Sequence, residues 1–223
     1  MKHKVSINYN KNNDNYLTEL CVKYGSDKGS FNDYEMTPYG WKYHKYTDVY
    51  NMLLNHSRQY FKNVFEVGLG TNNPAVESTM GVNGVPGASL RMWRDYFPNA
   101  NIYGADIDKD ILFKEDRIST FYVDQLDAES INKMWSEIDC EFDLIIDDGL
   151  HRPNANISFL VNSFHKLKDN GIYIIEDVRT QDLDETCSFL IENNYHFMYI
   201  DLSDSNSILD DRVILIFKNK RDM

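Results

Sequence analysis

Short apolar runs alternate with longer amphipathic segments along most of the chain from residue 64 onward. The runs have strand length and are almost continuously apolar, as buried parallel strands are. They cover residues 64–67, 101–106, 120–124, 142–147 and 171–176. The intervening segments repeat apolar residues at helical spacing, as Ile131, Met134, Trp135 and Ile138 do. The alternation predicts an α/β fold with a parallel sheet covered by helices on both faces.

The last two apolar runs, 195–201 and 212–217, are separated only by a polar loop containing Asp204, Asp210 and Asp211. This loop is too short for the crossover that parallel strands require, so the two strands should form an antiparallel hairpin. Together with the earlier runs, they predict a Rossmann-like, seven-stranded sheet with an antiparallel terminal hairpin.

The first 60 residues follow a different pattern. Helical spacing predicts short helices over 16–22 and 45–58. We therefore expect a helical N-terminal cap over 1–60, packed on one compact unit over 61–223. The aromatic residues of the cap could pack in its core or stack on a sugar or an adenine. We favour the core. These aromatic residues are Tyr34, Tyr39, Trp41, Tyr43 and Tyr46.

The chain has 223 residues and a formal net charge of −12, which argues against a basic face for nucleic acid. No apolar run approaches the roughly 20 residues of a membrane span. The first residues contain no apolar leader. We therefore expect a cytoplasmic protein that binds a small molecule and neither nucleic acid nor a membrane. A homo-oligomer stays open.

Carboxylates follow nearly every predicted strand. In an open α/β sheet, ligands bind beyond the carboxyl ends of the strands, where these side chains gather. A single acid there is unremarkable, because acids favour loops and helix N-termini. Five strand ends carrying acids along one rim predict an active site. The acids are Glu66, Asp106, Asp124, Asp147, Asp148, Glu176 and Asp177.

The first strand end is also rich in glycine. Gly68-Leu69-Gly70 allows a ligand to approach the backbone closely, and Asp106 after the second strand suits a ribose diol. The third glycine of a dinucleotide-binding fingerprint is missing, which disfavours an NAD-dependent oxidoreductase. Residues 72–86 read as an inserted loop that could act as a lid.

At these residues the sequence resembles the class I S-adenosylmethionine-dependent methyltransferases. It is most similar to the sugar O-methyltransferases of macrolide tailoring, of the mycinamicin type. The matching stretches are residues 24–28, 66–70, 87–93, 145–151 and 175–177. The resemblance implies S-adenosylmethionine as methyl donor. It also implies a donor site made of Glu66, Gly68, Gly70, Ser89, Asp106, Asp124, Gln125 and Asp147.

The same resemblance implies that Asp148, Glu176 and Asp177 hold Mg²⁺ and that His151 is the general base. Asp148 is then catalytic as well, since it holds the metal beside the base. Carboxylates are the hard oxygen ligands that Mg²⁺ prefers. Leu150 departs from the family, which often has serine there.

The leading hypothesis is thus an S-adenosylmethionine-dependent, Mg²⁺-dependent O-methyltransferase. Its acceptor would be a sugar hydroxyl in a nucleotide sugar, a polysaccharide unit or a glycosylated natural product. Metal-independent N- or O-methylation of another small molecule is an alternative within the transferases. An NAD-dependent oxidoreductase and a non-catalytic donor-binding module are alternatives from other classes. His151 and the acids argue against the binding module, which has no use for a base.

Overall fold

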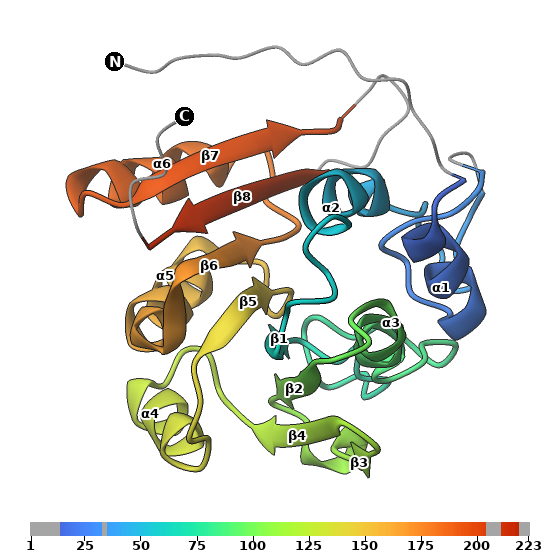
Figure 1. Ribbon diagram of the computed structural model, residues 1–223, viewed down its shortest axis with the longest axis horizontal. Helices are drawn as coiled ribbons and strands as arrows, with labels where there is room; N and C mark the ends of the chain where they lie inside the picture. Colours follow the sequence, from blue (N-terminus) through green and yellow to red (C-terminus); the bar gives the residue numbers. More distant parts are fainter. Residues whose placement is uncertain (1–13, 33–34, 204–210, 219–223) are drawn as a thin grey trace.

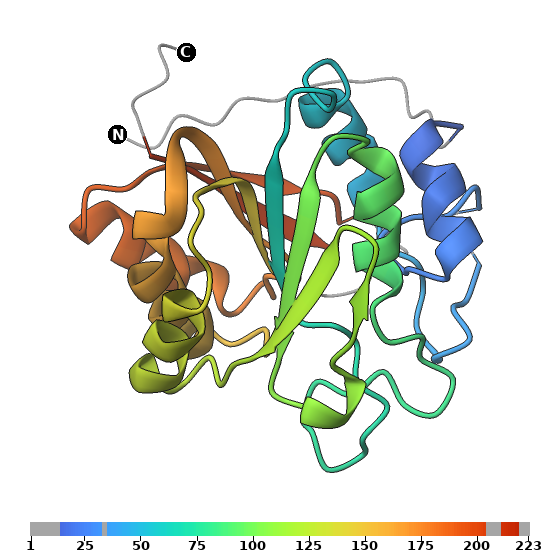
Figure 2. The ribbon, with the colours of Figure 1, turned by 60° about the horizontal axis from the view of Figure 1, so that its bottom comes forward.

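The computed structural model describes residues 14–32, 35–203 and 211–218. Tyr34, Asp204 and Asp210, singled out above, lie outside these ranges. The described residues form three layers, with one sheet between two layers of helices (Figures 1 and 2). The expected α/β architecture is confirmed.

The sheet has eight strands in the order β3-β4-β2-β1-β5-β6-β8-β7. The strands β4, β2, β1, β5 and β6 are parallel to one another, while β8 is antiparallel to β6 and β7 is antiparallel to β8. The bounds are β1 Asn63–Val67, β2 Asn101–Asp106, β3 Lys114–Glu115, β4 Ile118–Tyr122, β5 Phe142–Asp147, β6 Leu167–Ile175, β7 His196–Asp201 and β8 Arg212–Phe217.

The expectation of seven strands is wrong by one, because β3 pairs antiparallel with β4 and adds an eighth. Strand β3 is only two residues long and polar, so no apolar run reveals it. Its turn into β4 places Arg117 at φ 57°. The predicted antiparallel terminal hairpin is confirmed by β7 and β8.

Three helices cover each face of the sheet, with α1, α2 and α3 on one side and α4, α5 and α6 on the other (Figure 2). The helices are α1 Tyr16–Tyr24, α2 Tyr46–Leu54, α3 Ala88–Tyr96, α4 Ala128–Ser136, α5 Pro153–Ser163 and α6 Leu183–Glu192, with short 3₁₀ helices η1 Lys109–Ile111 and η2 Phe164–Lys166. Among the described helices, none has both the length and the apolarity needed to span a bilayer.

Local signals fix several helix ends. The Asn15 side chain accepts a hydrogen bond from the Thr18 amide at the start of α1, and Gly25 ends that helix with φ 78°. Asp127 caps α4 in the same way as Asn15 caps α1, and Pro153 occupies the first turn of α5.

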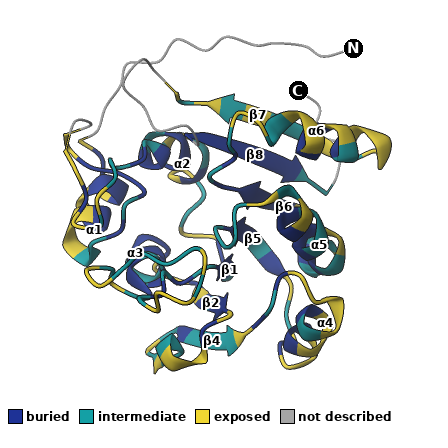
Figure 3. Ribbon diagram, turned by 180° about the vertical axis from the view of Figure 1, so that it is seen from behind, coloured by how far each residue is buried: buried dark blue, intermediate teal, exposed yellow. Residues whose placement is uncertain are grey.

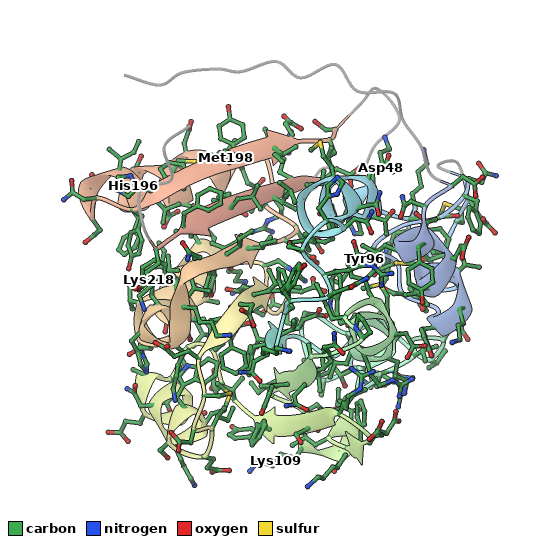
Figure 4. The ribbon with its side chains drawn as sticks, in the orientation of Figure 1. Asp48, Tyr96, Lys109, His196, Met198 and Lys218 are labelled. Carbon is green, nitrogen blue, oxygen red and sulfur yellow. The ribbon has the colours of Figure 1, made fainter. Side chains whose placement is uncertain are left out.

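Each face of the sheet has its own apolar core (Figure 3). Trp93 of α3 and Tyr50 of α2 are fully buried on one face. On the other face, the rings of Phe65 and Trp135 pack with their centroids 4.6 Å apart. The Tyr96 ring lies between α3 and α1, 6.3 Å from the Tyr16 ring (Figure 4). Helices α1 and α2 therefore share one core with the sheet, and the division at residue 60 stays a prediction.

Candidate active site

Three backbone hydrogen bonds align the strand ends. Beyond the strands, the amide of Gly68 donates to Ala105, that of Asp148 to Val67, and that of Glu176 to Asp147, at 2.9–3.0 Å. The pairing thus continues one residue past β1, β5 and β6. The residues that follow these strands consequently start at one level, at the rim where an open α/β sheet binds ligands.

A cavity of about 340 Å³ opens over this rim. It is lined by residues of the strand ends, the segment after α1, the loop 72–86 and the start of α3. The described lining residues are Gly25, Ser26, Asp27, Lys28, Trp41, His44, Tyr46, Gly68, Leu69, Gly70, Ser78, Thr79, Met80, Val85, Ala88, Ser89, Asp106, Asp148, Gly149, His151, Glu176 and Asp177. The predicted rim and this cavity coincide.

On one side of the cavity the backbone is exposed for close contact. Gly68 has φ 94°, and a Cβ atom there would lie 1.8 Å from the carbonyl oxygen of Asp148. Gly70 has φ 77° and also lines the cavity. Asp106 lies beside them, where its carboxylate accepts hydrogen bonds from the amides of Leu69 (2.7 Å) and Asp108 (2.8 Å). Burial raises the pKa of Asp106 against the effect of these amides.

Four of the expected donor-binding residues do not contribute to the described lining of the cavity. Glu66 is fully buried below it and accepts hydrogen bonds from Ser89 and Trp93. Asp147 is buried too and accepts from the Gln125 amide at 2.7 Å. Burial raises the pKa of Asp147 to about 6.

Gln125 also accepts a hydrogen bond from the Leu150 amide at 2.9 Å and so fixes the turn that carries His151. Asp124 accepts from the Leu126 amide at 2.9 Å in the turn before α4.

A buried lysine joins two of the expected metal ligands. The Lys28 ammonium lies 2.6 Å from Asp148 and also contacts Glu176, while only 2% of its side chain is exposed. Glu176 further accepts a hydrogen bond from the Tyr50 hydroxyl. Burial raises the pKa of both Glu176 and Asp148, although Lys28 opposes this. The nearby Asp177 charge also raises both pKa values, so one lysine does not offset all of the negative charge gathered here.

Asp177 is held from the other side by the N-terminal part of the chain. It accepts a hydrogen bond from Tyr46 at 2.5 Å, and His44 Nε2 lies 3.6 Å away. The His44 ring stacks on Tyr46 and places Nδ1 3.0 Å from the buried Asp211 carboxylate. Burial alone would lower the pKa of His44. The carboxylates of Asp177 and Asp211 nevertheless hold this pKa well above its usual value. His44 and His151 likewise keep the pKa of Asp177 low, against burial.

His151 faces both Asp148 and Asp177. Its Nε2 atom is 4.0 Å from Asp148 Oδ1 and 3.8 Å from Asp177 Oδ2. Its buried Nδ1 has no hydrogen-bond partner among the described residues. Both His151 (φ 55°) and Asp177 (φ 54°) adopt a left-handed backbone conformation that is uncommon outside glycine. Strain of this kind gathers at functional sites.

The donor atoms around His151 suit a hard cation. One ligand atom each from Asp148, His151 and Asp177 lies within 4.8 Å of the others. The carboxylates provide oxygen ligands, and their excess negative charge favours Mg²⁺. Glu176 is not part of this group; its carboxylate contacts Lys28 and Tyr50. The structure thus brings Asp148 and Asp177 together around His151 and places Glu176 beside them.

Sequence reasoning did not identify several residues of the site. Lys28 stood in a stretch that matched the methyltransferase family, and this was the available signal for it. His44, Tyr50 and Asp211 come from segments with no local motif, so only tertiary contact reveals them.

The chain is similar to sugar methyltransferases of actinomycetes. It is 31% identical to the 8-demethyl-8-alpha-L-rhamnosyl tetracenomycin-C 2'-O-methyltransferase of Streptomyces olivaceus over 165 residues. It is 32% identical to the mycinamicin VI 2''-O-methyltransferase of Micromonospora griseorubida, also over 165 residues. Each match covers 74% of this chain, but only 38% and 36% of the respective relative. The chain thus spans well under half the length of these relatives.

The solved structures agree with the sequence comparison. The mycinamicin-pathway methyltransferase MycE, solved with Mg and SAH, superimposes with a TM-score of 0.64 at 25% identity. The match covers 92% of this chain and 55% of MycE. No family model matches the chain.

The fold and the rim define the class: the predicted resemblance to class I S-adenosylmethionine-dependent methyltransferases is confirmed. Within that class, the predicted similarity to the sugar O-methyltransferases of macrolide tailoring is confirmed as well.

Proposed function

We propose that this protein transfers a methyl group from S-adenosylmethionine to a sugar hydroxyl, and that Mg²⁺ assists the transfer. The observation that carries the proposal is one cavity in which a glycine-lined rim with Asp106 meets the Asp148–His151–Asp177 group. The named activities of the sugar methyltransferases described above support the same reaction.

The donor binds over Gly68 and Gly70, with its ribose diol on Asp106. A carboxylate can accept from two adjacent hydroxyls at once. Ser89 lines the cavity, whereas Glu66, Gln125 and Asp147 act from below it by fixing Ser89, the strand ends and the 149–151 turn. Asp124 fixes the turn before α4. The acidic rim also favours the positive sulfonium of the donor.

His151 accepts the proton of the sugar hydroxyl as the oxygen attacks the methyl group in line with the departing sulfur. Asp148 and Asp177 lie within 4.0 Å of its Nε2 atom and stabilise the imidazolium that forms. The donor is already activated, so the protein mainly supplies alignment and proton removal. A positioned base of this kind is worth roughly 10²–10⁴-fold in rate.

Asp148 and Asp177 would hold the metal, with Glu176 as the third carboxylate that the family resemblance implies. When bound, Mg²⁺ lowers the pKa of a coordinated hydroxyl and orients it. The residues of this chain keep the site ready, because Tyr46 and His44 hold Asp177 while Lys28 holds Asp148.

Charge favours an uncharged glycoside over a nucleotide sugar as the acceptor. The cavity is lined by five carboxylates. Its Lys28 ammonium is already bound to Asp148 and Glu176, and its His44 ring already faces Asp177. The pyrophosphate of a nucleotide sugar would be repelled by such a wall. A glycosylated natural product carries no such charge, and the rhamnosyl tetracenomycin relative is named for an acceptor of this kind.

One observation favours a second candidate, metal-independent methylation. Lys28 already supplies a positive charge between Asp148 and Glu176, where the metal would otherwise act. Activity that survives chelation would select this candidate and leave the donor assignment intact.

Donor binding provides the first experimental test. Calorimetry should detect S-adenosylhomocysteine binding, and NADH should not bind. Asp106→Asn should weaken that binding, because the amide replaces a carboxylate that accepts from both ribose hydroxyls. Asp110→Asn, in η1, is the control variant. Equal affinity of the Asp106 variant and the wild type would remove Asp106 from the donor site.

A further inference from the structure

The cavity has a second wall that the transfer chemistry leaves unused. It is formed by Asp27, which follows α1, and by Trp41, and both line the cavity that contains the His151 group. Their side chains are joined, because the Trp41 indole N–H donates to Asp27 Oδ2 at 2.9 Å. An aromatic surface and a carboxylate therefore lie side by side at this wall.

Trp41 is held in a fixed position. Its carbonyl oxygen accepts from the Thr37 amide (2.7 Å) and the Thr37 hydroxyl (2.8 Å), and a β-bridge between Met36 and Lys42 closes the turn. The Tyr39 ring packs against the indole, with centroids 5.3 Å apart. An aromatic side chain fixed in this way loses little entropy when a ligand binds.

Asp27 is connected to the reacting groups through its neighbours. Its carbonyl oxygen accepts from the His44 amide at 2.8 Å, and the next residue is Lys28. Lys28 contacts Asp148 and Glu176, while His44 contacts Asp177. The backbone of Asp27 is therefore tied to the two residues that contact Asp148, Glu176 and Asp177.

The sheet order separates this wall from the adenosine end of the cavity. Asp106 ends β2, which lies on one side of β1. His44, three residues after Trp41, contacts Asp177 after β6 and Asp211 before β8, on the other side. His44 thus ties the segment that carries Trp41 to the β6–β8 side of the cavity.

We propose that Asp27 and Trp41 form the sugar-recognition subsite of this enzyme. The apolar face of the sugar ring packs on the indole, and a ring hydroxyl that is not methylated donates to the Asp27 carboxylate. An aromatic ring offers apolar area at low entropic cost, and hydrogen bonds to a charged acceptor are stronger than neutral ones. This inference rests on the proposed function for the chemistry of the acceptor.

The test compares acceptor and donor affinities of Trp41→Ala, Trp41→Phe and Asp27→Asn. The acceptor probe is methyl α-L-rhamnopyranoside, measured by saturation-transfer NMR on protein loaded with S-adenosylhomocysteine. Trp41→Ala should weaken its binding about tenfold, the equivalent of about 1.4 kcal/mol. Asp27→Asn should also weaken it, because the amide oxygen keeps the Trp41 bond but loses the charge. Affinity for S-adenosylhomocysteine should stay at the wild-type value in all three variants.

Tyr60→Ala is the matched control, since Tyr60 is an aromatic side chain that is 78% exposed and outside the cavity. It should leave both affinities unchanged. Weaker donor binding in Trp41→Phe and Asp27→Asn would place the pair at the adenosine and overturn the proposal. So would unchanged glycoside binding in both Trp41→Ala and Asp27→Asn, or no glycoside binding by the wild type. These outcomes all concern binding. If the wild type bound the glycoside but did not methylate it, the result would count against the proposed function and not against the subsite.

Discussion

At the scale of single residues, the proposed chemistry depends on His151 and on the charges that surround it. The His151 Nε2 atom lies within 4.0 Å of carboxylate oxygens of Asp148 and Asp177, and the backbone of His151 has φ 55°. Substitution by asparagine is preferable to alanine here, because asparagine tolerates φ 55° better.

His151→Asn should lower the rate of methyl transfer by roughly 10²–10⁴-fold, the usual contribution of a positioned base. Donor affinity should stay unchanged, because the imidazole faces the acceptor. Single-turnover rates measure the first quantity and calorimetry the second. His165→Asn, at a histidine in η2 on a distant part of the chain, is the control. A wild-type rate in His151→Asn would require another base.

Lys28 is the most deeply buried cation of the site. Lys28→Met should lower the free energy of unfolding by about 3–5 kcal/mol, because it leaves buried carboxylates without their partner. Urea unfolding without metal measures this loss. Added Mg²⁺ should then stabilise the variant more than the wild type, since it replaces the missing charge.

Lys168→Met is the matched control for this change. Lys168 pairs with Asp143 at 2.9 Å, but a third of its side chain is exposed, so its loss should cost at most about 1 kcal/mol. Equal losses in the two variants would contradict the assignment of Lys28 as a buried counter-charge.

At the scale of elements, the site depends on how closely the turns after β1 and β5 approach each other. Gly68→Ala should weaken S-adenosylhomocysteine binding about tenfold or more, because its Cβ would overlap the Asp148 carbonyl. Gly40→Ala separates this clash from backbone strain, since Gly40 has φ 104° with nothing within 4 Å of a Cβ. Calorimetry with both variants checks the result. The expectation fails when the two variants bind alike.

The contact between α1 and α3 predicts a pH effect on stability. Burial alone would raise the pKa of Asp95. Hydrogen bonds from Tyr24, Lys23 and Arg94 nevertheless lower this pKa to about 2. A lowered folded-state pKa stabilises the fold above the unfolded value, near 4, and this gain is lost as the pH falls toward 2.

Asp95→Asn should therefore lower the free energy of unfolding at pH 7 by about 1 kcal/mol. It should also flatten the stability profile between pH 4 and pH 2. Denaturant unfolding at several pH values measures both effects. Asp116→Asn, at an exposed turn residue, is the control, and a profile for Asp95→Asn as steep as that of the control would contradict the assignment.

The same scale explains how far the sequence alone could lead. Strands such as β5 and β8 are predictable because burial on both faces demands continuous apolar runs. The ends of the predicted strands then place Asp148 and Glu176 at the rim of the sheet. Strand β3 has no such signature. Strand β4 begins two residues earlier than its apolar run suggested, at Ile118. Lys28 contacts Asp148 and Glu176, which follow it in the sequence by 120 and 148 positions. No local pattern encodes such contacts.

At the scale of the whole molecule, the helical N-terminal segment lines the candidate active site as well as covering the sheet. Lys28, His44 and Tyr46 come from this segment and hold Asp148, Glu176 and Asp177 of the rim. Separating residues 1–60 from the rest would therefore remove contacts to every expected metal ligand. The lid role of the loop 72–86 stays a prediction. Its Glu77 pairs with Arg152 beside His151, and its Asn83 donates to the Pro38 carbonyl near Trp41.

The measurement that tests the central claim most directly is transfer of a deuterated methyl group from labelled S-adenosylmethionine to methyl α-L-rhamnopyranoside and related neutral glycosides. Mass spectrometry would detect the product with the wild-type protein and Mg²⁺. We expect the label on a sugar oxygen, one S-adenosylhomocysteine per product, and a loss of roughly 10²–10⁴-fold in His151→Asn. A folded protein that binds S-adenosylhomocysteine but labels none of these glycosides would contradict the sugar hydroxyl as acceptor. A folded protein that does not bind S-adenosylhomocysteine would contradict the account as a whole.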